Sequence, residues 1–284
     1  SWSLFDLSRK KLAVDLAPVP VVAWLMIFQA LVFLVFAPFD GWGAIPLSTY
    51  LGPFLISVAL NAFANIWFVE AVALAPFSLA IPILSLTPVF STAGALLLLN
   101  ESVTPKQVLG IAIIVGATLA IGYFGTKKSA AATADAHTTS DAKAIRKGLG
   151  LMAVVALLFA LTPVVDKLCL RTGVPASEHG FLQCFATALS LGIWIKIRGG
   201  GVAFSRVRSN LVWFIAAIIF ATLAVYFQFY SIQYIPVGIF EALKRSFGLI
   251  AALALGSLMF KEPITKLKAG LVVLMGVGIF VLLA

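Results

Sequence analysis

The chain has 284 residues, of which 62% are hydrophobic and only 11% are charged. A soluble domain has about 45–50% apolar and about 25% charged residues, so this composition excludes an ordinary soluble globular protein. The net charge of +9 does not indicate nucleic-acid binding, because the basic residues fall in short segments between apolar runs and no nucleic-acid-binding motif accompanies them. We expect an integral membrane protein that has a lipid bilayer around it and no nucleic-acid partner.

The apolar runs predict membrane-spanning helices, because a helix needs about 20 mostly apolar residues to cross a bilayer. Strands of a membrane barrel would alternate apolar and polar residues, whereas these runs are apolar on all sides. We expect an all-α polytopic membrane protein with ten transmembrane helices, the first of them truncated to residues 1–8. The other nine helices are expected at residues 19–39, 52–74, 76–99, 107–124, 148–165, 180–197, 211–234, 236–260 and 267–284.

The sequence divides into two similar halves. Residues 126–147 are small and charged, and they predict a linker between a first repeat at 1–125 and a second at 148–284. Residues 54–76 align with residues 214–236, which places Pro76 on Pro236. Each half has an odd number of helices, so the second half must enter the membrane inverted relative to the first. Inverted repeats recur in secondary transporters, with the substrate site between the halves.

Basic residues predict the orientation. Most of the 20 Lys and Arg residues fall on the side of the linker, and positively charged loops remain in the cytoplasm. We therefore expect a cytoplasmic linker, extracytoplasmic termini and a location in a bacterial inner membrane.

The sequence carries no motif for catalysis or for a cofactor. It contains no HExxH, GxSxG or GxxxxGK[ST] motif, and its two cysteines, Cys169 and Cys184, lack metal-ligand spacing. His137 in the linker and His179 in a loop are interpreted as solvated surface residues. We expect neither an enzyme nor a bound cofactor or metal.

Polar residues within the first apolar runs are candidates for a substrate site. Asn61 and Asn65 share one face of a helix, where they either line a cavity or join neighbouring helices. Pro82 and Pro88 predict an interrupted helix, either with carbonyl groups exposed to a solute or with a simple packing kink.

Two carboxylates are candidates for proton coupling. Asp166 follows the helix predicted at 148–165, and Glu70 lies near the end of the helix at 52–74. A buried carboxylate takes up a proton when burial raises its pKa, which would link transport to a proton gradient. Asp166 equally fits a position at the membrane surface, and the place of Glu70 near the end of its helix favours an interfacial residue.

Later in the chain, Tyr226, Tyr230 and Gln233 are spaced at i, i+4 and i+7. This polar-aromatic stripe is typical of a cavity wall that offers hydrogen bonds, and it also fits packing between helices.

The helix at 236–260 carries three charged residues, Glu241, Lys244 and Arg245. A charge near the bilayer centre costs at least about 2.5–3.5 kcal/mol, so these side chains must pair or face a cavity. Glu241 is placed to pair with either cation, at i+3 or i+4. One positive charge is left over, which either receives an anionic substrate or belongs to a structural ion-pair cluster.

Residues 71–121 resemble the EamA-like branch of the drug/metabolite transporter superfamily. The resemblance lies in the helix start at Ala75-Pro76, the Pro82 and Pro88 pair, the loop at 100–104 and the glycine-bearing helix after it. The second half repeats this pattern at 261–278, so the resemblance covers nearly the whole chain.

The resemblance implies ten helices around a central cavity and transport by alternating access. Relatives are usually drawn with both termini in the cytoplasm, opposite to the orientation that the charges predict. Lys244 and Arg245 are similar to the phosphate-binding pair of the sugar-phosphate translocator branch, although Glu241 departs from that pattern. We expect a secondary transporter of a small metabolite, anionic or zwitterionic; the alternatives are a lipid flippase, a channel or a non-transporting scaffold.

Overall fold

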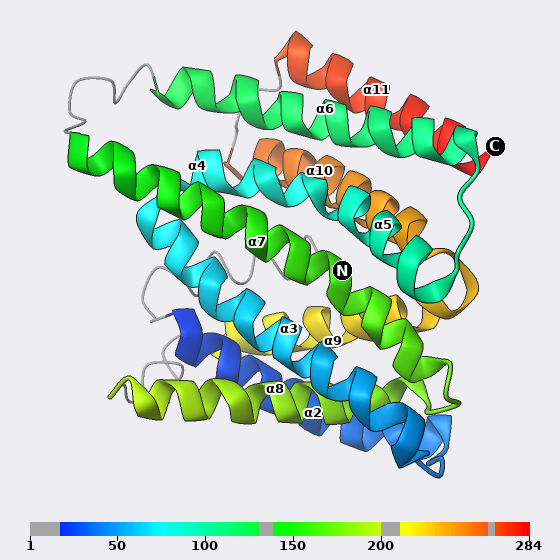
Figure 1. The fold of residues 1–284 in the computed structure, drawn as a ribbon. Coiled ribbons are helices and arrows are strands. Elements are labelled where there is room, and N and C mark those ends of the chain that lie inside the picture. Colours follow the sequence, from blue (N-terminus) through cyan, green and yellow to red (C-terminus); the bar gives the residue numbers. More distant parts are fainter. Residues whose placement is uncertain (1–17, 131–138, 200–210, 261–264) are drawn as a thin grey trace. The chain divides into compact units, whose positions relative to one another are not determined.

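The computed structural model describes residues 18–130, 139–199, 211–260 and 265–284 (Figure 1). Every regular element in these ranges is a helix. In chain order the elements are α2 (Pro18–Asp40), α3 (Leu47–Leu74), α4 (Phe77–Ala80), the 3-10 helix η1 (Ile81–Leu86), α5 (Thr87–Leu99), α6 (Pro105–Ala130), α7 (Thr139–Leu170), α8 (Ala176–Ile197), α9 (Leu211–Tyr234), α10 (Val237–Phe260) and α11 (Lys266–Leu283).

The helix bounds agree closely with the apolar runs. The helix predicted at 211–234 has those bounds, whereas α3 begins five residues before the predicted start at 52. Helices α6 and α7 also extend into the predicted linker at 126–147, where Ala and Lys favour helical backbone. The truncated helix predicted at 1–8 lies outside the described residues.

Seven helices of the described chain are long and apolar enough to cross a membrane, and a shorter apolar helix covers Pro105–Ile121. This supports a polytopic helical membrane protein, with fewer qualifying helices than the ten predicted. Helix α10 is not among the seven, and it carries the charged residues Glu241, Lys244 and Arg245.

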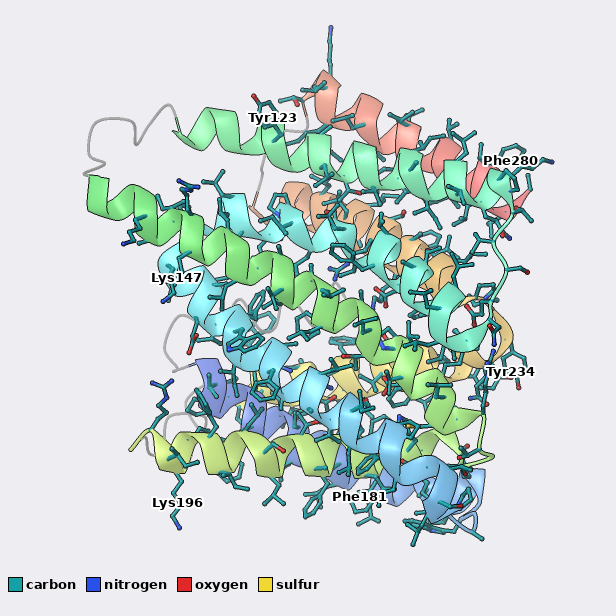
Figure 2. The ribbon with its side chains drawn as sticks, viewed as in Figure 1. Tyr123, Lys147, Phe181, Lys196, Tyr234 and Phe280 are labelled. Atoms are coloured by element: carbon teal, nitrogen blue, oxygen red, sulfur yellow. The ribbon has the colours of Figure 1, made fainter. Side chains whose placement is uncertain are left out.

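Large apolar side chains cover the outside of the helices. Phe280 on α11 is 75% exposed and Tyr123 on α6 is 62% exposed; both are labelled in Figure 2. Exposure of such a surface to water is unfavourable, and monomeric soluble proteins rarely expose large contiguous apolar patches. The apolar exterior fits contact with hydrocarbon.

The chain forms two compact units. Unit 1 contains Ser1–Ile66 and Thr162–Ile235, and unit 2 contains Trp67–Leu161 and Pro236–Ala284. Each unit takes helices from both halves of the sequence, and α3 and α7 contribute residues to both units. The units are defined by contacts, whereas the predicted repeats are defined by sequence similarity.

In unit 1, α2 packs extensively along α8. The ring of Phe33 lies against Gly180, where a Cβ atom would come within 2.8 Å of it. Near the end of α2, Asp40 accepts a hydrogen bond from the backbone N–H of Ser177, at the start of α8. The end of α2 therefore meets the start of α8, and the two helices are antiparallel.

In unit 2, α6 and α11 lie side by side (Figure 1). Gly110 contacts the backbone of Leu282, and Gly278 contacts Ile114, so these helices are also antiparallel. Close approach of helix backbones through small residues is a common basis of helix association in membranes.

Helices α5 and α10 form the second antiparallel pair of unit 2. Gly238 at the start of α10 contacts Thr92, and Arg245 further along α10 reaches Thr87 at the start of α5. At Gly238 a Cβ atom would come within 2.0 Å of the Thr92 hydroxyl, so glycine fixes how closely the two helices approach.

We predict that Gly110→Ala destabilises the protein. The added Cβ would lie 2.7–2.8 Å from backbone atoms of Leu282, which cannot move aside as a side-chain tip can. Overpacking of this kind costs about 1–3 kcal/mol, more than the roughly 1 kcal/mol that Ala gains over Gly in a helix.

Thermal unfolding in detergent measures this effect, with Gly116→Ala as the control. Gly116 lies on the same helix and has no atom within 4 Å of its Cβ position. An equal or higher Tm for Gly110→Ala would contradict the close α6–α11 contact.

Candidate functional site

Among the described residues, a cluster of interacting polar side chains lies in each unit; it is buried in unit 1, whereas Lys244 and Arg245 of the cluster in unit 2 are only partly buried. The cluster in unit 1 is called the Asp166 cluster and consists of Tyr50, Ser57, Asp166, His179 and Gln183. The cluster in unit 2 is called the α10 cluster and consists of Thr87, Glu241, Lys244 and Arg245.

The Asp166 cluster is built around one carboxylate oxygen. Asp166 Oδ1 accepts hydrogen bonds from Gln183 Nε2 at 2.6 Å and from the Ser57 hydroxyl, and it lies 3.3 Å from His179 Nε2. Gln183 Nε2 also donates to Ser57 Oγ at 2.7 Å. Among the described residues, Asp166 Oδ2 has no hydrogen-bond partner.

His179 links this carboxylate to Tyr50. The Tyr50 hydroxyl lies 2.8 Å from His179 Nδ1, and the His179 ring makes an edge contact with Phe229 of α9 at 4.9 Å between centroids. All five side chains of the cluster are at most 3% exposed. A polar network buried this deeply has to be satisfied internally, because unpaired polar groups are costly in a membrane.

A tight turn between α7 and α8 brings Asp166 and His179 together. Gly173 lies in this turn with a φ of +89°, a conformation that favours glycine, and Pro175 precedes α8. The His179 N–H donates to the Pro175 carbonyl at 2.9 Å, which fixes the first turn of α8. Asp166 and His179 therefore come from neighbouring helix ends, and α3 supplies Tyr50 and Ser57.

Two further charged residues are buried beside this cluster. Glu178 is 2% exposed and accepts a hydrogen bond from the Gly43 N–H at 3.1 Å. Lys167 is 6% exposed and donates to the Ile235 carbonyl at 2.9 Å. The region thus holds two carboxylates, one ammonium group and one imidazole.

The interpretation of His179 as a solvated surface residue is wrong. Its exposure is 0%, because the α7–α8 turn folds the start of α8 inward against α3 and α9. Gln183 was not singled out either, although its spacing of four residues from His179 within an apolar helix indicated a shared polar face. His137 lies outside the described residues.

The α10 cluster pairs the charges of α10 within unit 2. Lys244 Nζ forms an ion pair with Glu241 Oε1, and Glu241 is 1% exposed. Arg245 Nε donates to the hydroxyl of fully buried Thr87 at 2.9 Å. Among the described residues, this is the one hydrogen bond of the Arg245 guanidinium.

The helix opposite α10 is interrupted next to Thr87. The predicted helix at 76–99 consists of α4, the 3-10 helix η1 and α5, with Pro82 inside η1 and Pro88 in the first turn of α5. Each proline lacks the N–H that would continue the helical hydrogen bonds, which explains the interruption. Pro82 is partly buried.

The loop after α5 fixes the start of α10. Asn100 ends α5 in the left-handed conformation, with a φ of 53°, which asparagine tolerates better than most residues. The chain then turns so that Glu101 Oε2 accepts a hydrogen bond from the N–H of Val237, the first residue of α10, at 2.9 Å. A carboxylate at a helix N-terminus is favourable, and this one joins α5 to α10. Glu262, aligned with Glu101 in the repeat, lies outside the described residues.

Tyr226, Tyr230 and Gln233 line one pocket of about 290 Å³ at the end of α9, together with Asp40 and the α7–α8 turn. The Tyr226 hydroxyl donates to Asp40 Oδ1 at 3.1 Å, whereas Gln233 donates to the Phe229 carbonyl of its own helix at 3.0 Å. Tyr230 is 52% exposed. The stripe therefore does line a pocket, at the end of the helix.

The remaining predicted residues make no hydrogen bond to either cluster among the described residues. Asn65 Nδ2 donates to the Asn61 carbonyl and to Asn61 Oδ1, both at 2.8 Å, so these bonds stay within α3. Glu70 is partly buried near the end of α3 and belongs to unit 2.

Comparison with known proteins identifies a family to which the sequence is similar. A model of the EamA-like transporter family matches residues 1–123 and 146–284. No curated protein matches the sequence. One crystal structure of a protein aligns with 99% of this chain and 91% of its own length, with a TM-score of 0.78 and 16% sequence identity, a likeness of fold alone.

We predict that Ser57→Ala destabilises the protein by about 1–3 kcal/mol, because it removes a donor from a buried carboxylate. Thermal unfolding in detergent measures the change. Ser190→Ala is the matched control, since the Ser190 hydroxyl donates to a carbonyl of its own helix, that of Ala186. If both variants lost the same stability, the Ser57–Asp166 hydrogen bond would stabilise the protein no more than a hydrogen bond within one helix does.

Proposed function

We propose that this chain, which belongs to the EamA-like transporter family, carries a small anionic or zwitterionic metabolite across a membrane by alternating access. The observation behind the substrate class is the α10 cluster, where two cations and one carboxylate lie inside an apolar helix bundle.

The charge balance of the α10 cluster supports an anionic group in the substrate. Glu241 neutralises Lys244, and the Arg245 guanidinium retains its charge and its terminal N–H donors. Arginine offers a planar set of donors that fits a carboxylate or a phosphate with two parallel hydrogen bonds. Without a substrate anion, this charge would be costly within hydrocarbon.

The interrupted helix supports the same location. Helix η1 ends at Leu86, directly before Thr87, which accepts the hydrogen bond from Arg245. Irregular backbone at membrane depth is tolerated where it lines a cavity, and transporters commonly bind substrate at such broken helices. We assign Pro82, Thr87, Lys244 and Arg245 to the substrate site, with Glu241 holding Lys244 in place.

We propose a separate polar binding site at the pocket in unit 1. Tyr226, Tyr230 and Gln233 together with Asp40 offer hydroxyl, amide and carboxylate groups to a polar solute. At the end of α9 this pocket would be an entry site. Asn61 and Asn65 act as structural residues, because they bond to each other.

Alternating access is supported by the antiparallel pairs. Helices α6 and α11 occupy equivalent places in the two predicted repeats, as do α5 and α10, and each pair packs in opposite directions. We therefore propose two inverted repeats, 1–125 and 148–284, around a cytoplasmic linker at 126–147. The positive charge on the linker side supports this orientation in a bacterial inner membrane.

A lipid flippase is less well supported. An apolar groove of about 370 Å³ lies between α2 and α9, lined by Phe28, Leu31, Val35, Ile215, Ile219 and two neighbouring aliphatic residues. No charged or polar side chain lines it to bind a lipid headgroup, so the groove fits an acyl chain of the surrounding bilayer.

We predict that glycerol 3-phosphate or glutamate, but not glucose, raises the Tm of the solubilised protein. A ligand at 100 times its Kd stabilises the folded state by about 2.7 kcal/mol. Arg245→Ala abolishes this stabilisation, and Arg245→Lys retains part of it because the charge remains. Arg198→Ala leaves it intact, since Arg198 is exposed and lies over the Trp194 ring.

Uptake of the stabilising metabolite into proteoliposomes completes the test. We expect saturable uptake that Lys244→Ala and Arg245→Ala each abolish in folded protein. Unchanged uptake in both variants would contradict the assignment of the substrate site to Lys244 and Arg245. Absence of uptake of any anion or zwitterion would contradict the proposed function.

A further inference from the structure

The Asp166 cluster has the composition of a proton-binding site. Here His179 lies 3.3 Å from the buried carboxyl group of Asp166. Histidine is the side chain that ordinarily changes charge between pH 5 and 8. The substrate site proposed above does not use either group.

Hydrogen-bond directions show which atoms donate within the cluster. Ser57 Oγ accepts from Gln183 Nε2, so its own proton is directed to Asp166 Oδ1. Gln183 Nε2 can only donate, and it also meets Asp166 Oδ1. Asp166 Oδ1 therefore acts as an acceptor, and the His179 Nε2 atom that faces it at 3.3 Å is placed to donate to it.

The other ring nitrogen of His179 is free to accept or to carry a proton. With His179 neutral, the Tyr50 hydroxyl donates to Nδ1 across 2.8 Å. With His179 protonated, Nδ1–H donates to the same hydroxyl oxygen, since a tyrosine hydroxyl both donates and accepts. Rotation of one hydroxyl hydrogen thus accommodates the added proton, and no heavy atom has to move.

Ionisable side chains surround His179 in unit 1. Three of them are buried: the carboxyl groups of Asp166 and Glu178 and the amino group of Lys167. Counted with the formal charges of these groups, a protonated His179 makes positive and negative charges equal in number, which matters where the dielectric constant is low.

In the described part of the chain, the other groups that the packed helices bring to the cluster are neutral or acidic. From α3 and α7 these are the Tyr50 hydroxyl and the Cys169 thiol, and from α8 the Cys184 thiol. Helix α9 contributes the Phe229 ring, and Asp40 of α2 bonds to the Ser177 N–H two residues from His179.

The position of the cluster gives this proton a mechanical consequence. Tyr50 and Ser57 lie on α3 and Asp166 lies on α7, the two helices that contribute residues to both units. A proton on His179 strengthens its contact with Asp166 by adding an ionic component, and so changes how firmly α3, α7 and α8 are joined.

We propose that the Asp166 cluster binds one proton on His179 Nδ1 and that this proton is the coupling ion for transport. Proton binding stands on the cluster alone, whereas the coupling role rests on the proposed function.

Proton binding can be measured without any substrate. The sequence has two histidines, so His137→Gln leaves His179 as the only imidazole. We expect histidine-labelled protein in lipid nanodiscs to show, by NMR, a single imidazole that changes from neutral to protonated between pH 4.5 and 9. In Asp166→Asn the midpoint should change, because a neutral amide then replaces the carboxylate that faces His179 Nε2.

This titration has clear contrary results. A His179 ring that keeps one protonation state over this pH range would overturn the proton site, whether or not Asp166→Asn folds. An unchanged midpoint in a folded Asp166→Asn protein would overturn the role of Asp166. Tyr50→Phe is a third variant, which removes the hydroxyl next to His179 Nδ1. The NMR chemical shift of Nδ1 should therefore change, while the chemical shift of Nε2 stays close to its original value.

The coupling role is tested by uptake of labelled glycerol 3-phosphate and glutamate into proteoliposomes. We expect His179→Gln to abolish the acceleration by a pH gradient and to retain exchange without a gradient, whereas the matched His137→Gln variant keeps both. Uptake by the unmodified protein that ignores the gradient would overturn coupling alone. Absence of any uptake would overturn the proposed function and leave the titration as it stands.

Discussion

A polar group inside hydrocarbon has to find its partner within the protein, and this constraint governs both clusters. Asp166 has three partners around one oxygen, from α3 and α8, and Glu241 meets Lys244 one turn further along α10. Removing one partner from a buried charge costs more than the pair contributes, because the remaining charge stays buried. The clusters therefore help to fix which helices pack together, and they hold the groups to which we assign solute and proton binding.

Close antiparallel packing gives the clusters their positions. Gly110 and Gly278 let α6 approach α11, and Gly238 does the same for α10 against α5. Each compact unit consequently mixes both halves of the chain, since a helix packs against its counterpart from the other half. Arg245 meets Thr87 for this reason, although 158 residues separate them in sequence.

The sequence predicted local features well and distant contacts poorly. Apolar runs place helices such as 211–234 correctly, and Pro82 and Pro88 mark the interruption seen as η1. His179 was misplaced because a histidine after a Gly- and Pro-containing turn resembles a surface residue, and only the folded turn buries it. The contact of Ser57 with Asp166 spans 109 residues, and no periodicity within one helix encodes it.

Two oppositely oriented repeats are the claim on which the carrier mechanism depends. Lys106 and Lys266 occupy equivalent places, each at the start of its helix, and both are exposed. With Cys169 and Cys184 replaced by alanine, single cysteines at these two positions report their side through a membrane-impermeant maleimide in oriented vesicles. The account predicts labelling of the two positions from opposite sides of the membrane; labelling of both from the same side would contradict it.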